Sequence, residues 1–378
     1  MKKLKSIKTG LISRQFQLFK MVAKTGVDVL LSQKESINER VVNAIGDRAQ
    51  NLVDEFGNLK GSFVKAGQIL SLYGDYFFPP EVRDILGQFQ NENSFLDWEV
   101  IKKEIPAEIL TKLEMIPTPI AAASIGQVHQ GEIIADKKKI VLKIQYKGVD
   151  KTIDNDIRAL KLFLNLSKFI PKNIDLNGFF NEIKTMLKQE IDYVKERNFQ
   201  DEYITLLKDD NRFYVPLILP ALSNKKVLCS EYIKGEKPDV RFFETLTQTE
   251  RNILGDSYFK LFLKEVFEWG VVQTDAHPGN YLIRKVGDHW QWVLLDFGAT
   301  KKLPNKFLKN YKLLAKAALI DDRELFMSQL ETMGYIGAMN REQKEILWDY
   351  VGNVFSPLYV DEFDWGESSI PDYVLKNG

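Results

Sequence analysis

Two short stretches of this sequence decide its fold: VQTDAHPGN at residues 272–280 and LLDFG at residues 294–298. They place Asp275 five positions before Asn280, and a second aspartate, Asp296, after a short apolar run. Phosphoryl-transfer enzymes use this spacing for a catalytic carboxylate and two Mg²⁺ ligands, because the metal neutralises the nucleotide phosphates. We expect Asn280 and Asp296 to bind Mg²⁺, and Asp275 to orient or deprotonate an attacking hydroxyl. Taken alone, each stretch also fits an ordinary surface turn.

A candidate phosphate-covering loop lies upstream, in AAASIGQVH at residues 121–129. On the G-x-G-x-x-G-x-V pattern of kinase loops, alanines replace the first two glycines, and only Gly126 remains. Alanine lets backbone amides approach a phosphate but reaches positive φ less easily than glycine. We expect a stiff loop, although an alanine run also favours a helix. The residues expected to contact the nucleotide here are Ala121, Ala122, Ala123, Ser124, Gly126 and Val128.

The sequence KIVLKIQ predicts an apolar strand with Lys143 in its middle. Burying this lysine is costly unless an anion lies near it, so we expect Lys143 to bind nucleotide phosphates. Its carboxylate partner is expected on a helix predicted over residues 186–198, where Asp192 and Glu196 lie four positions apart on one face. Glu190 lies about a third of a turn from Glu196 and should contact a different neighbour.

These elements follow one another in the order of a protein kinase: loop, strand lysine, acidic helix, apolar strand, catalytic loop and DFG. The apolar strand is KVLCSEYI at residues 226–233. We expect Glu231, Tyr232 and Ile233 to form a hinge whose backbone groups bind adenine. Cys229 is expected to be a small buried residue of that strand and not a nucleophile.

One upstream motif, GSFVKAGQILS, has no counterpart in ordinary protein kinases. It contains K-x-G-Q at Lys65 to Gln68, and an E-x-D follows at Glu190 and Asp192. With these motifs and the Ala-rich loop, the chain resembles the UbiB family of atypical kinases, also called AarF or ABC-one-like, over about residues 61–300. That family supports isoprenoid quinone biosynthesis in many organisms. The resemblance implies an α+β, protein kinase-like bilobal fold with an N-terminal helical extension that carries K-x-G-Q.

The resemblance also implies that this extension folds over the active site. Lys65 and Gln68 lie three positions apart and share a helix face, and Lys65 would meet Glu190 and Asp192 there. Such a cover would occupy the space that a peptide substrate takes in protein kinases. The resemblance supports the nucleotide-binding, metal-binding and catalytic roles given above to Lys143, Glu196, Asn280, Asp296 and Asp275.

Several functions remain open. The first is a UbiB-like atypical kinase or ATPase that binds ATP and Mg²⁺ and supports quinone or other lipid metabolism at a membrane surface. The second is a small-molecule phosphotransferase of the aminoglycoside or choline kinase type, whose catalytic loop also reads D-x-H-P-x-N but which gives no reason for K-x-G-Q. A nucleotide-binding scaffold is disfavoured because Lys143, Asp275, Asn280 and Asp296 are all present. A protein kinase is disfavoured because no A-P-E sequence follows Gly298.

Composition fits a large enzyme and excludes several other classes. The chain has 378 residues, 44% of them hydrophobic, and a formal net charge of zero, so we expect a substantial core and no nucleic-acid partner. One cysteine excludes an internal disulfide, and with three histidines it leaves no plausible zinc cluster. The sequence shows no run of about 18 apolar residues and no secretory signal, so we expect a cytoplasmic protein.

The first 26 residues are basic and carry no acidic side chain. With apolar residues at approximate helical spacing, they predict an amphipathic helix. Such a helix can lie on an anionic bilayer, which would make the protein peripheral to the membrane and bring it near lipid precursors or other quinone-biosynthesis proteins. It can equally pack on the body of the protein, and both alternatives stay open. The basic residues are Lys2, Lys3, Lys5, Lys8, Arg14, Lys20 and Lys24.

We expect three segments along the chain. Residues 1–110 form a helical extension with the K-x-G-Q motif. Residues 111–235 form a kinase-like small lobe with the Ala-rich loop, the strand lysine and the hinge. Residues 236–378 form a mostly helical large lobe with the catalytic loop, DFG and an acidic tail.

Overall fold

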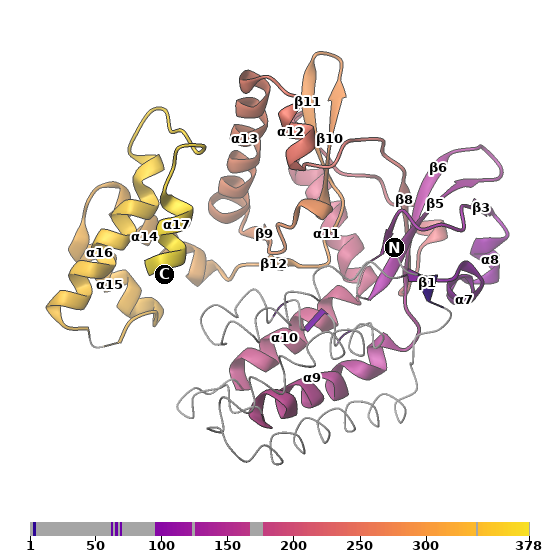
Figure 1. The fold of residues 1–378 in the computed structure, drawn as a ribbon, viewed down its shortest axis with the longest axis horizontal. Coiled ribbons are helices and arrows are strands. Elements are labelled where there is room, and N and C mark those ends of the chain that lie inside the picture. Colours follow the sequence, from indigo (N-terminus) through magenta and orange to yellow (C-terminus); the bar gives the residue numbers. More distant parts are fainter. Residues whose placement is uncertain are drawn as a thin grey trace, which may run out of the picture. The chain divides into compact units, whose positions relative to one another are not determined.

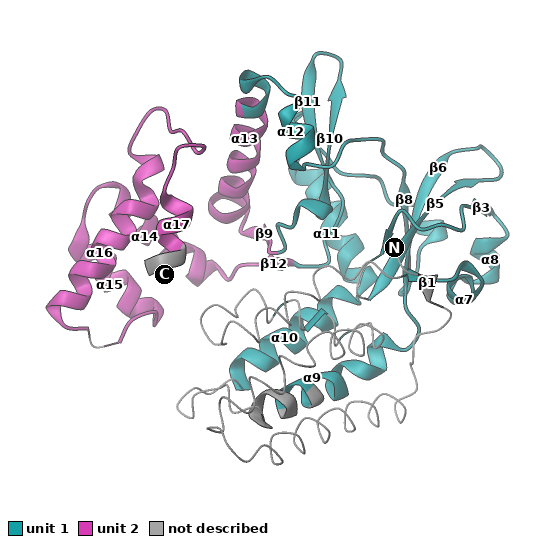
Figure 2. Cartoon of the chain, viewed as in Figure 1, with its two compact units in different colours: residues 1–251, 275–299 teal, residues 252–274, 300–378 magenta. Residues whose placement is uncertain are grey.

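The computed structural model describes residues 3–4, 62, 65, 66, 69, 95–122, 125–166, 177–337 and 339–377. Figure 1 shows the helices and strands along the chain, and Figure 2 shows the two compact units into which its contacts divide the chain. Unit 1 consists of Met1–Arg251 and Asp275–Ala299, and unit 2 of Asn252–Thr274 and Thr300–Gly378. These boundaries differ from the three segments expected along the chain, and that organisation stays a prediction.

The largest sheet of unit 1 is antiparallel and has five strands. Its strands lie in the order β3 (Leu113–Met115), β5 (Gly126–Ile133), β6 (Lys139–Gln145) and β8 (Val227–Glu231). The short strand β4 (Ala121–Ala122) also pairs with β5. Successive residues of a strand point to opposite faces. Leu142 and Ile144 therefore enter the core of this unit, while Lys143 points away from it. The strands predicted around Lys143 and at residues 226–233 are confirmed.

A strand and three short helices precede this sheet. They are β2 (Phe95–Leu96), α7 (Trp98–Ile101), the 3₁₀ helix η2 (Lys102–Glu104) and α8 (Ala107–Leu110). The carboxylate of Asp97 caps α7 by accepting the N–H of Glu99 at 3.0 Å. β2 pairs in parallel with β1 (Lys3–Leu4), so the segment before residue 111 contains strands as well as the helices expected there. The helix predicted in the first 26 residues otherwise lies outside the described residues.

Three longer helices of unit 1 follow β6. They are α9 (Val149–Leu166), α10 (Asn177–Glu190) and α11 (Tyr193–Leu206). The single helix predicted over residues 186–198 is wrong, because α10 ends at Glu190 and α11 begins after Asp192. Asp192 has non-helical φ and ψ of −94° and 82°, and its carboxylate accepts the N–H of Lys195 at 3.1 Å. Aspartate competes for backbone N–H groups in this way and favours a new helix start over continuation.

A second sheet of unit 1 has two strands between the two stretches quoted first, and one of these strands ends at Leu294. It orders β10 (Tyr281–Val286), β11 (His289–Leu294) and β7 (Phe213–Tyr214). Gly287, with φ of 58°, lies in the turn between β10 and β11, where a positive φ suits glycine. Tyr281 pairs with Leu294, so the residues just before β10 and just after β11 are neighbours. The N–H of Leu295 accordingly donates to the carbonyl of Asn280 at 2.9 Å.

Shorter helices of unit 1 are η3 (Pro220–Leu222), α12 (Val240–Glu244) and η5 (Pro278–Asn280). α13 (Gln248–Leu263) leads from unit 1 into unit 2. Unit 2 continues with a π-helix, η4 (Lys264–Trp269), the paired strands β9 (Val271–Gln273) and β12 (Thr300–Lys302), and then α14 (Asn305–Leu319), α15 (Arg323–Met333), α16 (Arg341–Phe355), η6 (Ser356–Leu358) and α17 (Ile370–Asn377).

The core of unit 2 forms where α14, α15 and α16 meet. Leu314, Phe326 and Val351 contribute one buried side chain from each helix. Among the described residues, no helix has both the length and the apolar character needed to cross a membrane. Sheets and helices together confirm the α+β class.

Candidate functional site

Lys143 lies on the face of β6 opposite to the core, where its ammonium meets two carboxylates. Its Nζ is 2.7 Å from Glu196 Oε1 and 2.9 Å from Asp296 Oδ2. Glu196 belongs to the first turn of α11, and Asp296 follows β11. The ring of Tyr193 lies 5.2 Å from the same ammonium. The structure thus brings together the strand lysine, the helix glutamate and the DFG aspartate singled out in the sequence.

Burial and charge act in opposite directions on these side chains. Burial disfavours the Lys143 ammonium, but the Asp296 and Glu196 carboxylates outweigh it and hold the pKa of Lys143 well above its ordinary value. Burial also opposes ionisation of Asp296, yet Lys143 and the N–H of Gly298 lower the pKa of this carboxyl. For Glu196, burial dominates and raises the pKa, against the charge of Lys143. Lys143 and Asp296 are therefore charged at neutral pH.

Two buried polar atoms beside Lys143 have no hydrogen-bond partner among the described residues: the hydroxyl of Tyr193 and Glu196 Oε2. Buried polar groups without a partner are uncommon in folded proteins. Tyr193 is 1% exposed and Glu196 is 2% exposed, so bulk water does not reach them freely. Both atoms retain hydrogen-bonding capacity for a ligand atom or a bound water in this site.

β4 and β5 form the two arms of the Ala-rich loop. Ala121 pairs with Val128 and Ala122 with Gln127, so these alanines are extended and the alternative of a helical alanine run is wrong for them. Val128 also lies directly opposite Lys143 on β6, and cross-strand neighbours share a face of the sheet. Outside the described residues lie the remaining predicted loop residues, Ala123 and Ser124, together with Gln68 of the K-x-G-Q motif.

Gly126 stands where the loop enters β5, and this position has no room for a side chain. A Cβ added there would lie 2.7 Å from the carbonyl oxygen of Ile144 and 3.0 Å from the hydroxyl of Tyr193. The first contact is with backbone, which cannot rotate away. The third glycine of the kinase-like pattern is therefore required for packing of β5 against β6 and Tyr193.

The structure describes four helical residues on one face of the K-x-G-Q segment: Ser62, Lys65, Ala66 and Ile69. Nζ of Lys65 lies 3.3 Å from Glu190 Oε1, the predicted partner, and 3.5 Å from Asp275 Oδ2. Burial disfavours its charge, but Glu190 and Asp275 outweigh burial and raise the pKa of Lys65. The hydroxyl of Ser62 bonds to Thr152 and Asp156 of α9, which fixes this helix face.

Asp192 does not join this group, although the sequence predicted that it would meet Lys65. Its carboxylate is exposed and caps α11. The family resemblance implied that Lys65 meets both carboxylates of E-x-D, and the single helix predicted over residues 186–198 placed Asp192 on the face of Glu196. The break after Glu190 separates the two carboxylates of E-x-D, so Glu190 contacts Lys65 while Asp192 sets the start of the helix that carries Glu196.

Most of the polar groups of the predicted hinge for which hydrogen bonds are seen bond to other residues of the protein. The carboxylate of Glu231 accepts from the hydroxyl of Tyr214 and, at 2.8 Å, from the N–H of Leu217. The N–H groups of Glu231 and Tyr232 already donate to the carbonyls of Leu217 and Lys139 at 3.0 and 3.1 Å. Within the part of the chain that the structure describes, the N–H of Ile233 has no such partner. Adenine binding by these three residues stays a prediction.

Asp275 and Asn280 are tied to each other across the catalytic loop. Nδ2 of Asn280 donates to the main-chain carbonyl of Asp275 at 2.9 Å. His277 shapes the turn between them, since its Nδ1 accepts the N–H of Gly279 at 3.0 Å. The carboxylate of Asp275 is 37% exposed, so it can meet an incoming group.

The donor set fits Mg²⁺ that arrives with a nucleotide. The pairing of β10 with β11 places Asn280 and Asp296 at the same end of the hairpin. Both offer oxygen, the ligand that Mg²⁺ prefers, and Mg²⁺ in nucleotide sites takes few protein ligands alongside phosphates and water. Asp296 is oriented by the N–H of Gly298 at 2.9 Å. Among the described residues, no group of three or more His, Cys, Asp or Glu is placed to hold a metal.

Reasoning from the sequence missed three features of this region. Tyr193 directly follows E-x-D, and only its position after the motif could have indicated it. Gln127 and His129 lie two positions apart in a strand, so they share a face, and the structure buries both of them. The contact of Lys65 with Asp275 spans 210 positions and has no local signal.

The sequence also matches known proteins. The model of the ABC1 atypical kinase-like domain matches residues 88–330. The atypical kinase COQ8, mitochondrial, of Saccharomyces cerevisiae is 28% identical over 390 residues, covering 99% of this chain and 77% of that protein. Its namesake in Schizosaccharomyces pombe is 30% identical over 331 residues, covering 84% of this chain, which spans about half (53%) of that relative.

A solved structure shows the same fold. The structure of Rv3197 from Mycobacterium tuberculosis in complex with erythromycin aligns with a TM-score of 0.59 and 23% identity, covering 89% of this chain and 86% of that one. The family match includes the Ala-rich loop, the strand lysine, the catalytic loop and DFG. It confirms a kinase-like fold, and this chain belongs to the family of ABC1 atypical kinase-like domains, which includes the UbiB and AarF proteins.

Proposed function

We propose that this protein is a UbiB-like atypical kinase or ATPase that binds Mg-ATP and supports isoprenoid quinone biosynthesis or related lipid metabolism at a membrane surface. The observation that carries the nucleotide part is the Lys143 ammonium, held between Glu196 and Asp296. A partly buried ammonium fixed at this place would bind nucleotide phosphates, and Asp296 and Asn280 would hold the Mg²⁺ that neutralises them. The quinone part rests on the relatives, which are COQ8 proteins.

Asp275 is the group we assign to the acceptor. Its carboxylate would orient a hydroxyl or a water for attack on the terminal phosphate and accept its proton. Because the same carboxylate is paired with Lys65, an acceptor must share or displace that ammonium. This favours water or a small acceptor over a peptide. Cytoplasmic localisation stays a prediction from the sequence, and the two yeast relatives are named as mitochondrial.

The proposal is tested by following ATP hydrolysis by the full chain with and without anionic liposomes and phenolic mimics of quinone precursors. Phosphorylation of a generic protein substrate is measured beside it. We expect Mg²⁺-dependent hydrolysis that liposomes or phenols increase, and little transfer to protein. Efficient transfer to protein without any effect of lipid or phenol would reject the proposed substrate class.

The metal assignment is tested with Asp296→Asn, which keeps the shape of the side chain and removes its charge. We expect the variant to lose the thermal stabilisation that Mg-ATP gives to the wild type. Asp209→Asn serves as the control, because Asp209 is an exposed aspartate outside the site. Equal stabilisation of the Asp296 variant and the wild type by Mg-ATP would contradict the role of Asp296.

A further inference from the structure

A buried polar clamp lies behind the Ala-rich loop and fastens β5 to β2. Gln127 is fully buried, and its side-chain amide pairs with a backbone unit: Oε1 accepts the N–H of Leu96 at 2.9 Å, and Nε2 donates to the carbonyl of Leu96 at 3.1 Å. The same Nε2 also donates to Nε2 of His129 at 2.7 Å. The glutamine amide thereby uses both of its N–H groups and its oxygen.

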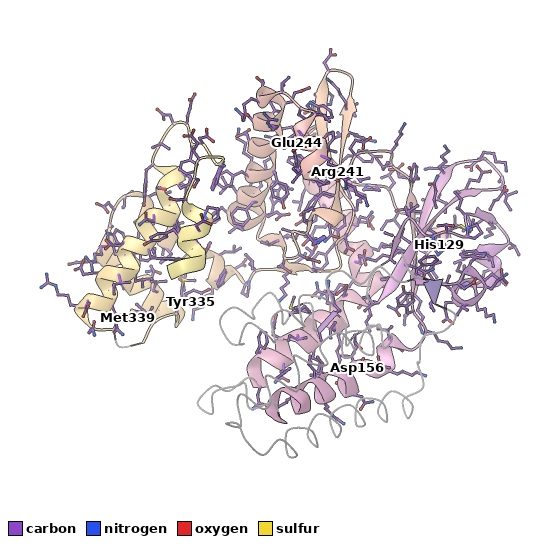
Figure 3. The ribbon with its side chains drawn as sticks, in the orientation of Figure 1. His129, Asp156, Arg241, Glu244, Tyr335 and Met339 are labelled. Carbon is purple, nitrogen blue, oxygen red and sulfur yellow. The ribbon has the colours of Figure 1, made fainter. Side chains whose placement is uncertain are left out.

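His129 completes the clamp, and Figure 3 shows it in the main sheet of unit 1. Its ring is fully buried, and Nδ1 donates to the carbonyl of Ile116 at 2.9 Å. Burial lowers the pKa of His129, although the bond to Ile116 opposes this, so the ring is neutral. The single proton on Nδ1 leaves Nε2 free to accept from Gln127. The ring of Trp98, 4.8 Å away, covers the imidazole.

The clamp lies directly behind the residues that face the nucleotide site. Gln127 pairs with Ala122 of the Ala-rich loop and immediately follows Gly126, the position without room for a side chain. Between the two clamp residues, Val128 points to the other face and lies opposite Lys143. One side of β5 therefore contributes to the site while the other side is fixed by Gln127 and His129.

We propose that Gln127 and His129 are positioning residues, which hold the two arms of the Ala-rich loop in the arrangement that receives the phosphates of an adenine nucleotide. This inference rests on the proposed nucleotide binding. If either partner is replaced by an apolar residue, the other keeps a buried polar atom without a partner, and the strand shifts to satisfy it. Such a shift moves Ala122, Gly126 and Val128 relative to Lys143.

A simple loss of stability must be separated from a change in the site, and Gln291 offers a matched control. It is also a buried glutamine on a strand of unit 1, and its amide donates to the carbonyls of Asn211 and Phe213 at 2.8 and 3.3 Å. Gln291 lies on β11, whereas the clamp lies on β5. Gln291→Met should therefore destabilise the fold to a similar degree without disturbing the Ala-rich loop.

The test compares the full-length wild type with Gln127→Met, His129→Leu, His129→Gln and Gln291→Met. Binding of Mg²⁺ with a non-hydrolysable ATP analogue is measured by calorimetry, together with the thermal midpoint and hydrogen exchange in peptides covering residues 118–130. We expect Gln127→Met and His129→Leu to raise Kd about tenfold and to speed exchange in those peptides, as for a lost buried hydrogen bond. His129→Gln keeps an acceptor for Gln127 and should bind more tightly than His129→Leu.

The outcomes separate this inference from the proposed function. Equal Kd values for the clamp variants and Gln291→Met, at similar losses in thermal midpoint, would overturn the clamp and leave nucleotide binding intact. Failure of the folded wild type to bind the analogue would overturn both. If His129→Leu fails to fold, Gln127→Met decides the matter, because methionine closely matches glutamine in size and leaves the histidine in place.

Discussion

Lys65 joins two carboxylates that belong to different parts of the site. Glu190 ends α10, and Asp275 begins the catalytic loop. A single ammonium between them offsets the repulsion that these carboxylates would otherwise exert on each other and on Asp296. The loss of folding stability caused by a neutral side chain at position 65 should therefore depend on pH.

We expect Lys65→Met to destabilise the protein by about 1–2 kcal/mol at pH 7 to 8, because a partly buried Glu190 loses its cation. Burial raises the pKa of Glu190 and Lys65 lowers it, so without Lys65 the pKa rises further. A carboxyl with a raised pKa costs stability only above the unfolded pKa of about 4.5. The difference in free energy of unfolding between the wild type and Lys65→Met should therefore shrink as pH falls from 8 to 5. Denaturant unfolding at several pH values measures it.

The matched control is the double variant Lys65→Met with Glu190→Gln. It removes the lysine together with the carboxylate that needs it, so most of the lost stability should return. A deficit that stays constant from pH 5 to 8, or that the second change does not relieve, would contradict this account of Lys65.

Gly126 gives a second prediction at this scale. Gly126→Ala places a methyl group 2.7 Å from the carbonyl oxygen of Ile144, so we expect a loss of about 1–3 kcal/mol and weaker binding of Mg-ATP. Gly255→Ala in α13 is the control, since its added Cβ meets no atom of the described residues within 4 Å. That change should leave stability equal or raise it by up to about 1 kcal/mol. Thermal unfolding with and without nucleotide measures both.

The break between α10 and α11 sets the position of Glu196. Asp192 caps α11 one turn before Glu196. The residue at which the helix starts therefore determines where Glu196 lies relative to Lys143. Asp192→Ala should cost about 1 kcal/mol and weaken nucleotide binding, whereas Asp192→Ser should retain both. Asp239→Ala, which removes the cap of α12, should lose similar stability but bind nucleotide normally. Equal binding by the two alanine variants would show that the Asp192 cap does not position Glu196.

Several elements of the site were predictable because their signals are local. A lysine in an apolar strand, and the spacing of Asp275, Asn280 and Asp296, follow from short windows of sequence, and the structure brings these residues together. The helix break at Asp192 was not predicted. Asp192 and Glu196 lie four positions apart in the sequence, and this spacing does not reveal whether Asp192 lies inside a helix or caps the start of a new one. The carboxylate of Glu231 was not expected to bond to Tyr214, because pairing between side chains far apart leaves no periodic pattern.

At the scale of the whole molecule, the chain passes between the two units several times. The segment with Asp275, Asn280 and Asp296 belongs to unit 1, while β9 before it and β12 after it belong to unit 2. β9 and β12 pair with each other, with Gln273 opposite Thr300. The two ends of the segment 275–299 are therefore joined by one pair of antiparallel strands. No change in composition and no linker in the sequence marks the points where the chain passes from one unit to the other. Three consecutive segments were expected for this reason.

Charge is balanced over the whole chain, so attraction to an anionic membrane must come from a local surface. Two basic parts of the sequence are candidates for this role: the first 26 residues, which carry no acidic side chain, and the exposed lysines of α14. We expect the first to bind, because it combines positive charge with apolar residues at helical spacing. The variant that tests it changes three lysines to glutamine and leaves β1 intact: Lys8, Lys20 and Lys24. The control makes the same change on α14, at Lys309, Lys312 and Lys316.

Each lysine near an anionic surface contributes about 1 kcal/mol, so the N-terminal variant should partition onto anionic vesicles roughly a hundredfold more weakly than the wild type. Co-sedimentation with anionic and with neutral vesicles measures this, and only the anionic series should respond. The α14 variant should sediment like the wild type. Loss of binding by the α14 variant alone would move the membrane surface to unit 2, and normal binding by the N-terminal variant would favour packing of its basic segment on the protein body.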